Sequence, residues 1–253
     1  MGTLIGSTFR DALALRTNGT PQYASNASPT FLPNTAGAFS FWYKPTTVLT
    51  SNVFKSIIAM GNGTAGNNAT FMINQRWASS VGSIPVIEIL VRRTNGGAFS
   101  AVVGTVALTA GTRYHIVVQS NGTAWSIYLN GSAETLVNWQ TGDGTNPGNW
   151  FGDMVLGNPV FTIGARMFDG SPGMYSDQDI NEVTYFDRDL TGGEITALYN
   201  GGTPSNPHRI TSLGSAWKSW WRMGDSRDDA TTVYDEIGTN NLTLVNSPSY
   251  VAA

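Results

Sequence analysis

Hydrophobic and polar residues alternate in short runs along most of the chain, and nearly every run ends at Gly, Asn, Pro or Asp. Runs rich in Val, Ile, Phe, Tyr and Trp suit the half-buried surface of a β-sheet. They predict strands at 39–44, 53–60, 69–77, 86–93, 114–119, 124–129, 161–166 and 180–186. We therefore expect an antiparallel all-β protein.

Asn-Gly pairs mark the expected turns. The clearest hairpin joins 114–119 to 124–129 through Ser120-Asn121-Gly122-Thr123, and further pairs stand at 18–19, 62–63, 95–96 and 130–131. Asn and Gly both tolerate positive φ, which type I′ hairpin turns require. Some of these pairs also spell Asn-X-Ser/Thr, but residues 1–10 lack the basic and apolar regions of a secretory signal, so turns are favoured over glycosylation.

One short helix is predicted near 191–200. Thr191 and Glu194 form a capping box, in which each side chain satisfies a backbone N–H of the first turn. Ile195 and Leu198 then share an apolar face, and Gly201 is suited to a left-handed end. Regular strands with one short helix are typical of a two-sheet sandwich and not of a doubly wound α/β sheet.

Composition narrows the function classes. Only 12% of the 253 residues are charged, the net charge is −3, and there is no cysteine. Arg92–Arg93 is the one adjacent basic pair, so we expect no nucleic-acid partner, which would need clustered Lys and Arg. Disulfides and thiolate metal sites are excluded. No apolar run approaches the roughly 18 residues of a membrane span, so we expect no transmembrane segment.

Four stretches in order resemble the laminin-G-like, concanavalin-A-like lectin domain. They are AFSFWYKP at 38–45, YHIVVQSNGTAWSIYLNG at 114–131, FTIG at 161–164 and INEVTYFDRDLTGGEITALYN at 180–200. The resemblance implies a two-sheet antiparallel jelly roll. The series is more specific than any single stretch.

The C-terminal segment resembles the part of the domain that normally comes first. The pieces are WWRMGD at 220–225, YDEIGTNNLT at 234–243 and NSP at 246–248. We expect one domain over 1–253, with 208–253 completing the sandwich or exchanging with a neighbouring subunit, because chain ends often lie close together. The sequence of this segment resembles C-terminal sequences of structural proteins of tailed phages.

The sequence is compatible with three functions. The first is a non-enzymatic virion surface protein, a capsid decoration or a tail or fibre adhesin, whose partners are virion proteins, further copies of itself, or a host-surface glycan. The second is a free carbohydrate-binding lectin. The third is a glycoside hydrolase, which needs two carboxylates about 5–10 Å apart. Glu88 and Glu134 are isolated acids, and no acidic triplet on one strand is found, so we expect no enzyme.

A loop with two tryptophans is the candidate ligand or interface site. Aromatic residues on a long Gly/Asn loop are unusual for strand propensity alone. The candidate residues are Trp139, Asp143, Asn146, Asn149 and Trp150. Their aromatic rings could stack on sugar, seal a subunit contact, or fold back as a local core.

Calcium is a candidate cofactor, although none is required. Asp169, Asp177 and Asp179 lie in one loop-rich stretch, and the resemblance to lectins implies loop-bound Ca²⁺. The stretch does not match an EF-hand, because Glu182 and Arg188 occupy the positions of its glycine and final glutamate. A second acidic stretch holds Asp225, Asp228, Asp229 and Asp235. In both stretches the alternative is that the carboxylates cap turns at the surface and bind no metal.

Overall fold

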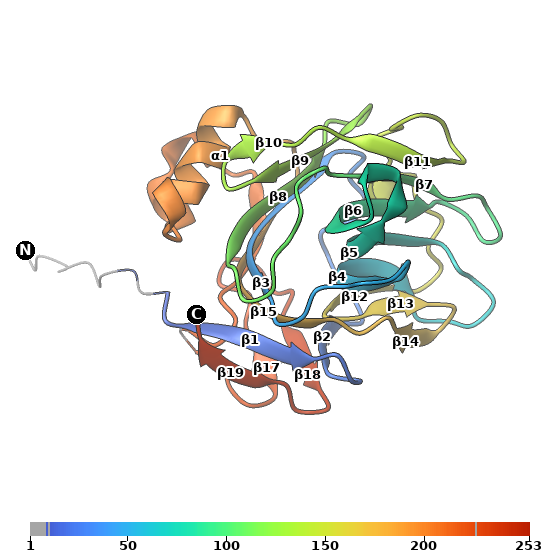
Figure 1. Ribbon diagram of the computed structural model, residues 1–253. Helices are drawn as coiled ribbons and strands as arrows, with labels where there is room; N and C mark the ends of the chain where they lie inside the picture. Colours follow the sequence, from blue (N-terminus) through green and yellow to red (C-terminus); the bar gives the residue numbers. More distant parts are fainter. Residues whose placement is uncertain (1–8, 10, 226) are drawn as a thin grey trace, which may run out of the picture.

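Two antiparallel sheets face each other in this protein (Figure 1). The computed structural model describes residues 9, 11–225 and 227–253. In these residues the expected all-β sandwich with a short helix is confirmed. No described helix is long and apolar enough to cross a membrane.

Sheet A has the strand order β10-β9-β8-β3-β15-β1-β19, and β16 also pairs with β15. Its bounds are β1 Leu13–Asn18, β3 Gly37–Pro45, β8 Tyr114–Ser120, β9 Trp125–Leu129, β10 Ser132–Ala133, β15 Asp177–Phe186, β16 Trp217–Trp221 and β19 Ser249–Ala252. The β8–β9 hairpin is the one predicted from the sequence, with Val118 opposite Ile127.

Sheet B has the order β11-β7-β6-β5-β4-β12-β2-β18-β17. Its bounds are β2 Tyr23–Asn26, β4 Phe54–Asn62, β5 Thr70–Ala78, β6 Ile84–Arg92, β7 Ser100–Val103, β11 Val137–Thr141, β12 Pro159–Ile163, β17 Thr232–Val233 and β18 Leu242–Val245. A separate hairpin, β13 Arg166–Phe168 and β14 Ser171–Gly173, lies beside β4. Short 3-10 turns are η1 Ser79–Val81, η2 Phe151–Asp153, η3 Asn200–Gly202, η4 Pro207–Arg209 and η5 Thr211–Leu213.

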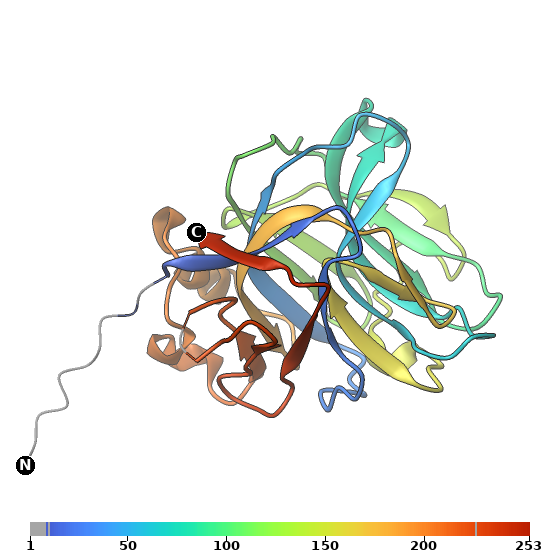
Figure 2. The same ribbon diagram turned by 90° about the horizontal axis from the view of Figure 1, so that it is seen from below.

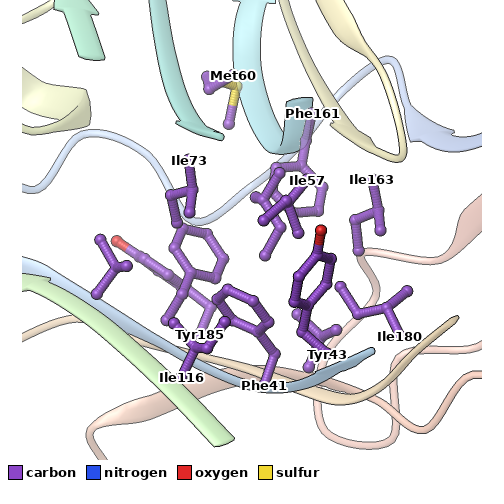
Figure 3. Close-up of a cluster of buried hydrophobic side chains, with 14 of the residues drawn as sticks. Phe41, Tyr43, Ile57, Met60, Ile73, Ile116, Phe161, Ile163, Ile180 and Tyr185 are labelled. Carbon is purple, nitrogen blue, oxygen red and sulfur yellow. The ribbon is translucent and has the colours of Figure 1, made fainter. Parts of the chain in front are cut away.

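The main core lies between the two sheets (Figure 3). Strand alternation sends every second side chain inward, so Phe41 and Tyr43 of sheet A meet Ile73 and Phe161 of sheet B, and Tyr185 joins them. All five are almost fully buried. Burying one such side chain contributes about 1.5–3 kcal/mol, and this apolar contact holds the sheets face to face.

The helix α1 (Gly192–Tyr199) covers the outer face of sheet A. Its predicted capping box is present, since the Thr191 hydroxyl accepts from the Glu194 N–H and the Glu194 carboxylate accepts from the Thr191 N–H. Ile195 and Leu198 pack on Val117 of β8 in a second apolar cluster. The left-handed end begins at Asn200 (φ 46°), one residue before the expected Gly201.

The Asn-Gly turns are not all of one type. At Asn130-Gly131 both residues have positive φ (50° and 80°), as a type I′ turn requires. At Asn121-Gly122 only the glycine does (φ 89°), and the Asn121 side chain accepts from the Thr123 and Ala124 N–H groups instead. The expected type I′ turn is therefore present at 130–131, whereas at 121–122 the asparagine side-chain hydrogen bonds stabilise another turn.

The C-terminal segment adds strands to both sheets within this chain. β16 pairs with β15, β19 pairs with β1, and β18 pairs with β2. Figure 2 shows the segment running alongside the first strands. The Trp221 ring lies in the main core against Phe161 at 5.2 Å, and its indole N–H donates to the Asn240 carbonyl at 2.7 Å. The segment thus supplies side chains to the core.

Candidate functional site

The outer face of sheet B carries an unusual set of aromatic and arginine side chains. Its floor is a small apolar cluster of Ala59, Met72, Leu90 and Ala101, one residue from each of four neighbouring strands. Half-buried Phe54, Phe99 and Trp139 pack around this floor. We call this surface, together with Arg76, Arg92, Arg166 and Phe168 on its borders, the outer-face site.

A buried carboxylate anchors one end of the outer-face site. Glu88 of β6 is fully buried and accepts from the Asn74 side-chain amide at 2.7 Å, while the Arg76 Nε lies 3.5 Å from its other oxygen. Burial raises the pKa of Glu88 to about 7, against the opposing pull of Arg76 and Asn74. The Arg76 guanidinium lies 3.7 Å from the centre of the Trp139 ring, which holds that ring in place.

Two further arginines border the opposite end. The Arg92 guanidinium lies 3.9 Å from the centre of the Phe99 ring, and that of Arg166 lies 4.2 Å from the Phe168 ring. Arg92 also faces Phe168 at 5.7 Å, so both arginines share one ring. Burial lowers the pKa of each, and the charge of Arg92 lowers that of Arg166 further. Within the described ranges, neither side chain forms an ion pair or a hydrogen bond.

The position of the β13–β14 hairpin depends on a glycine. A Cβ at Gly61 of β4 would lie 1.8 Å from the carbonyl oxygen of Met167, which no side chain allows. Gly61 therefore lets the hairpin approach the sheet, and this approach carries Arg166 and Phe168 to the edge of the outer-face site.

The predicted tryptophan loop divides between surface and core. Trp139 lies on β11 and belongs to the outer-face site. Trp150 is fully buried among Phe39, Phe71 and Phe151, which agrees with the alternative of a local core and not with a ligand or subunit contact. Its aromatic bulk fills one end of the sandwich core and is not available to a ligand.

The polar residues of that loop hold it against the domain. Asn146 accepts from the Trp125 N–H at 2.7 Å and donates to the Trp125 carbonyl at 3.1 Å, much as a neighbouring strand would. The Asn149 carbonyl accepts from the Trp125 indole at 2.8 Å. Asp143 pairs with Arg93 at 3.2 Å. These contacts match the third possibility left open by the sequence, a loop that folds back as local core.

The three aspartates predicted to bind calcium are not brought together. Asp169 accepts from the Gly66 N–H, and Asp177 accepts from the Thr46 and Thr47 hydroxyls. Asp179 pairs with Arg16 at 2.6 Å and with Lys44 at 2.9 Å. Although its burial favours the neutral acid, these two cations hold the pKa of Asp179 below its usual range. Each carboxylate thus has its own partners.

The second acidic stretch mostly caps turns. Asp228 accepts from the Gly224 and Tyr234 N–H groups, and Asp229 accepts from the Thr231 and Thr232 N–H groups. Buried Asp235 accepts from the N–H groups of Trp220, Ile237 and Asn240. Carboxylates with this many backbone donors order a loop without a metal ion.

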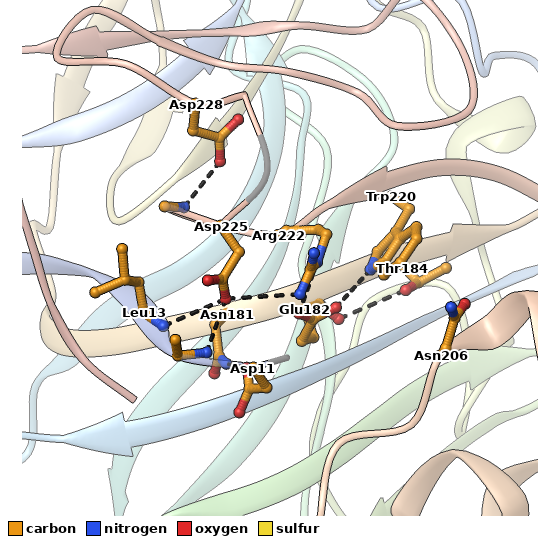
Figure 4. Close-up of polar contacts among 12 residues, drawn as sticks. Asp11, Leu13, Asn181, Glu182, Thr184, Asn206, Trp220, Arg222, Asp225 and Asp228 are labelled. Atoms are coloured by element: carbon orange, nitrogen blue, oxygen red, sulfur yellow. Dashed lines mark hydrogen bonds and ion pairs between the residues drawn. The ribbon is translucent and has the colours of Figure 1, made fainter. Parts of the chain in front are cut away.

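In the described part of the chain, one group of three carboxylates does converge, at Asp11, Glu182 and Asp225, whose oxygens lie within 4.8 Å (Figure 4). Arginines already neutralise it. Arg222 lies 3.1 Å from Glu182 and 3.7 Å from Asp225, and Arg113 lies 2.6 Å from Asp11. Burial raises the pKa of Glu182 to about 8 and also raises that of Asp11. The arrangement joins β15 to both chain ends as a charge network.

Glu88 and His115, the buried acid of sheet B and the buried histidine of sheet A, each have structural partners. Glu88 is surrounded by an amide, a guanidinium and an indole, whereas glycoside hydrolysis needs a facing pair of carboxylates. His115 contacts the Ser40 hydroxyl at 2.9 Å beneath a tightly packed surface, and burial lowers its pKa to about 3. His115 is therefore a neutral core residue.

Away from the outer-face site, the described residues also line open grooves of about 360 and 410 Å³. Phe31 lines the first, but its ring is enclosed by Tyr185 and Phe161 in the core. Phe9 lines the second, and its ring lies against Trp220 with Arg222 at 4.8 Å. Each groove is thus lined by a single aromatic ring that packs against other rings, whereas the outer-face site gathers several rings.

Sequence reasoning missed most of the outer-face site. In the sequence, Arg92 stands out only as half of a basic pair, and no motif marks Phe99, Arg166 or Phe168. The available signal was the strand alternation: Arg92 follows Glu88 and Leu90 on the polar face of a predicted strand, and Arg166-Met-Phe168 puts an arginine and a ring on one side of a hairpin.

Comparison with known folds agrees with a lectin sandwich. Over its full length the chain superposes on 65% of a Bacteroides ovatus protein for which carbohydrate binding has been suggested, with a TM-score of 0.62 and 16% identity. It also matches the CBM40 module of the Ruminococcus gnavus IT-sialidase bound to α2,3-sialyllactose, with a TM-score of 0.57 and 16% identity over 74% of this chain and 96% of that one. A heptameric SAP-like pentraxin of Limulus polyphemus matches at a TM-score of 0.52 and 14% identity, over 96% of this chain and 91% of that one.

The sequence itself carries the family signature over most of its length. The profile of the concanavalin A-like lectin/glucanases superfamily matches residues 18–196. The chain therefore belongs to this superfamily, as the four ordered stretches predicted. No curated protein is similar enough in sequence to be matched.

Proposed function

We propose that this protein is a non-catalytic carbohydrate-binding protein whose ligand lies on the outer-face site of sheet B. The lectin-type fold supports this class of function, and the neighbouring folds include a module described with a bound sialylated sugar. Fold alone does not assign a function, so the proposal depends on the side chains of the outer-face site.

The observation that carries the proposal is the gathering of half-exposed rings held by arginines. Phe99, Trp139 and Phe168 each lie against a guanidinium that is within 4.2 Å of the ring centre. An aromatic ring that is fixed before binding loses little conformational freedom when a flat sugar face stacks on it. Each guanidinium lies over one face of its ring, and its N–H donors can then bond the sugar oxygens.

A glycan array followed by calorimetry tests this proposal. Phe99→Ala removes a ring from the outer-face site, and Ile237→Ala removes a comparable exposed apolar side chain from the loop between β17 and β18. We expect the Phe99 variant to lose at least about tenfold in affinity for the glycans that the native protein binds, and the Ile237 variant to lose none. Equal affinities of both variants and the native protein would remove the outer-face site from consideration.

The virion assignment adds a location to this function. An adhesin of a phage tail or a capsid decoration would bind a host-surface glycan with the same face. This assignment rests on the resemblance of the C-terminal segment and stays a prediction, as does self-association. Light scattering of the purified protein measures its oligomeric state, and neighbouring genes for portal, capsid or tail proteins would support the location.

A further inference from the structure

Arg92 and Arg166 form a pair of like charges without a counter-charge in the described residues. Both guanidiniums lie near the Phe168 ring, at 5.7 and 4.2 Å, and both are partly buried. Their Nε atoms are inaccessible to solvent and have no hydrogen-bond acceptor. Holding two partly desolvated positive charges next to each other is unfavourable unless an anion lies between them.

The other arginines of sheet B differ in this respect. Arg76 has the Glu88 carboxylate at 3.5 Å, and Arg93, the residue next to Arg92, has Asp143 at 3.2 Å. Strand alternation directs Arg93 away from the outer-face site and leaves Arg92 on it. The missing counter-charge is therefore particular to Arg92 and Arg166 and is not a general property of this surface.

From this contrast we infer that the ligand of the outer-face site is an acidic saccharide, whose carboxylate or sulfate group binds between Arg92 and Arg166. This inference rests on the proposed function and specifies its substrate class. Guanidinium groups present paired N–H donors that match the oxygens of a carboxylate or sulfate. The Phe99 and Phe168 rings hold the two guanidiniums in position and flank the sugar ring that carries the acidic group.

Matched saccharides test the inference directly. The charged probes are an oligogalacturonate, α2,3-sialyllactose and lactose 3′-sulfate, and their neutral counterparts are the methyl-esterified oligogalacturonate and lactose. We expect at least one charged probe to bind about 10- to 100-fold more tightly than its neutral counterpart, which is the effect of a hydrogen-bonded charge. Raising the salt concentration should weaken that binding. The probe that binds identifies the group as a carboxylate or a sulfate.

Variants separate the arginine pair from the rest of the surface. Arg92→Gln and Arg166→Gln should each remove about tenfold or more of the preference for the charged probe, whereas Arg93→Gln serves as the matched control and should remove none. Arg92→Lys retains the charge but not the paired donors, so it should restore only part of the preference. Circular dichroism and thermal unfolding confirm that each variant is folded.

The outcomes distinguish the two proposals. If neutral and charged probes bind equally, and the glutamine variants match the native protein while Phe99→Ala does not, the acidic ligand is wrong and the carbohydrate site stands. If no charged or neutral saccharide binds, both proposals fail.

Discussion

The substitution Glu88→Gln tests whether Glu88, beneath the outer-face site, is a buried carboxyl group with a raised pKa. The substitution keeps the size and the acceptor for the Asn74 amide but removes the ionisable group. Because the folded-state pKa of Glu88, about 7, lies above its ordinary value of 4.5, folding favours the protonated form. The stability that Glu88 contributes is therefore complete below pH 4.5 and is lost as pH rises through 7.

The size of this effect follows from the pKa difference. A difference of about 2.5 pKa units corresponds to about 3 kcal/mol, of which about 2–3 kcal/mol is lost between pH 5 and pH 8. Glutamine has no such loss. Relative to the native protein, the Glu88→Gln variant should therefore gain about 2–3 kcal/mol of unfolding free energy when pH is raised from 5 to 8. Urea unfolding followed by tryptophan fluorescence measures the difference at each pH.

The difference in unfolding free energy between the two proteins at each pH removes the contribution of all other titrating groups, because both proteins share them. Asp229→Asn is a suitable control, because hydrogen bonds from Thr231 hold the pKa of this exposed carboxyl below its usual range and it stays ionised from pH 5 to 8. Its stability difference from the native protein should not change over that interval. A Glu88→Gln difference that is equally independent of pH would refute the reasoning, and so would a variant that becomes less stable at pH 8.

Three further predictions concern the fold. Trp221→Ala should destabilise the protein by about 3–5 kcal/mol in urea unfolding, because it empties a large core position filled by the C-terminal segment; a loss below about 1 kcal/mol would mean that this segment is peripheral. Thr191→Ala should cost about 1 kcal/mol by removing the cap of α1, and an unchanged stability would contradict the observed Thr191–Glu194 bonds. Asp179→Asn should flatten the acid limb of the stability profile, since its lowered pKa makes stability fall as pH drops below 4, and a profile identical to that of the native protein would show that its two ion pairs are absent in solution.

Sequence patterns predicted the parts of the fold that depend on residues close together in the sequence. The runs at 39–44 and 114–119 became β3 and β8, and Thr191 with Glu194 capped α1, because alternation and capping act over a few residues. The short strands β1, β2, β7 and β19 were not anticipated. They gain their order from pairing with distant strands, such as β1 with β19. β2, β7 and β19 have only four residues each, which is too few for a clear alternating pattern.

The candidate site was harder to predict than the fold. Trp139 and Trp150 looked equivalent in the sequence, but one lies over Arg76 on the surface and the other is buried at the end of the sandwich. Arg92 and Arg166 are 74 positions apart, and only the β13–β14 hairpin above Gly61 brings them to one ring. Such a site forms where segments far apart in the sequence come together in the folded protein, and the spacing of residues along the chain does not reveal it.

A structure of the protein with the tightest-binding glycan from the array tests the central claim most directly. We predict that the sugar lies on the outer face of sheet B, in contact with Phe99 or Trp139, with its acidic group between Arg92 and Arg166. A sugar bound in the groove lined by Phe31, or elsewhere away from sheet B, would contradict this account of the site.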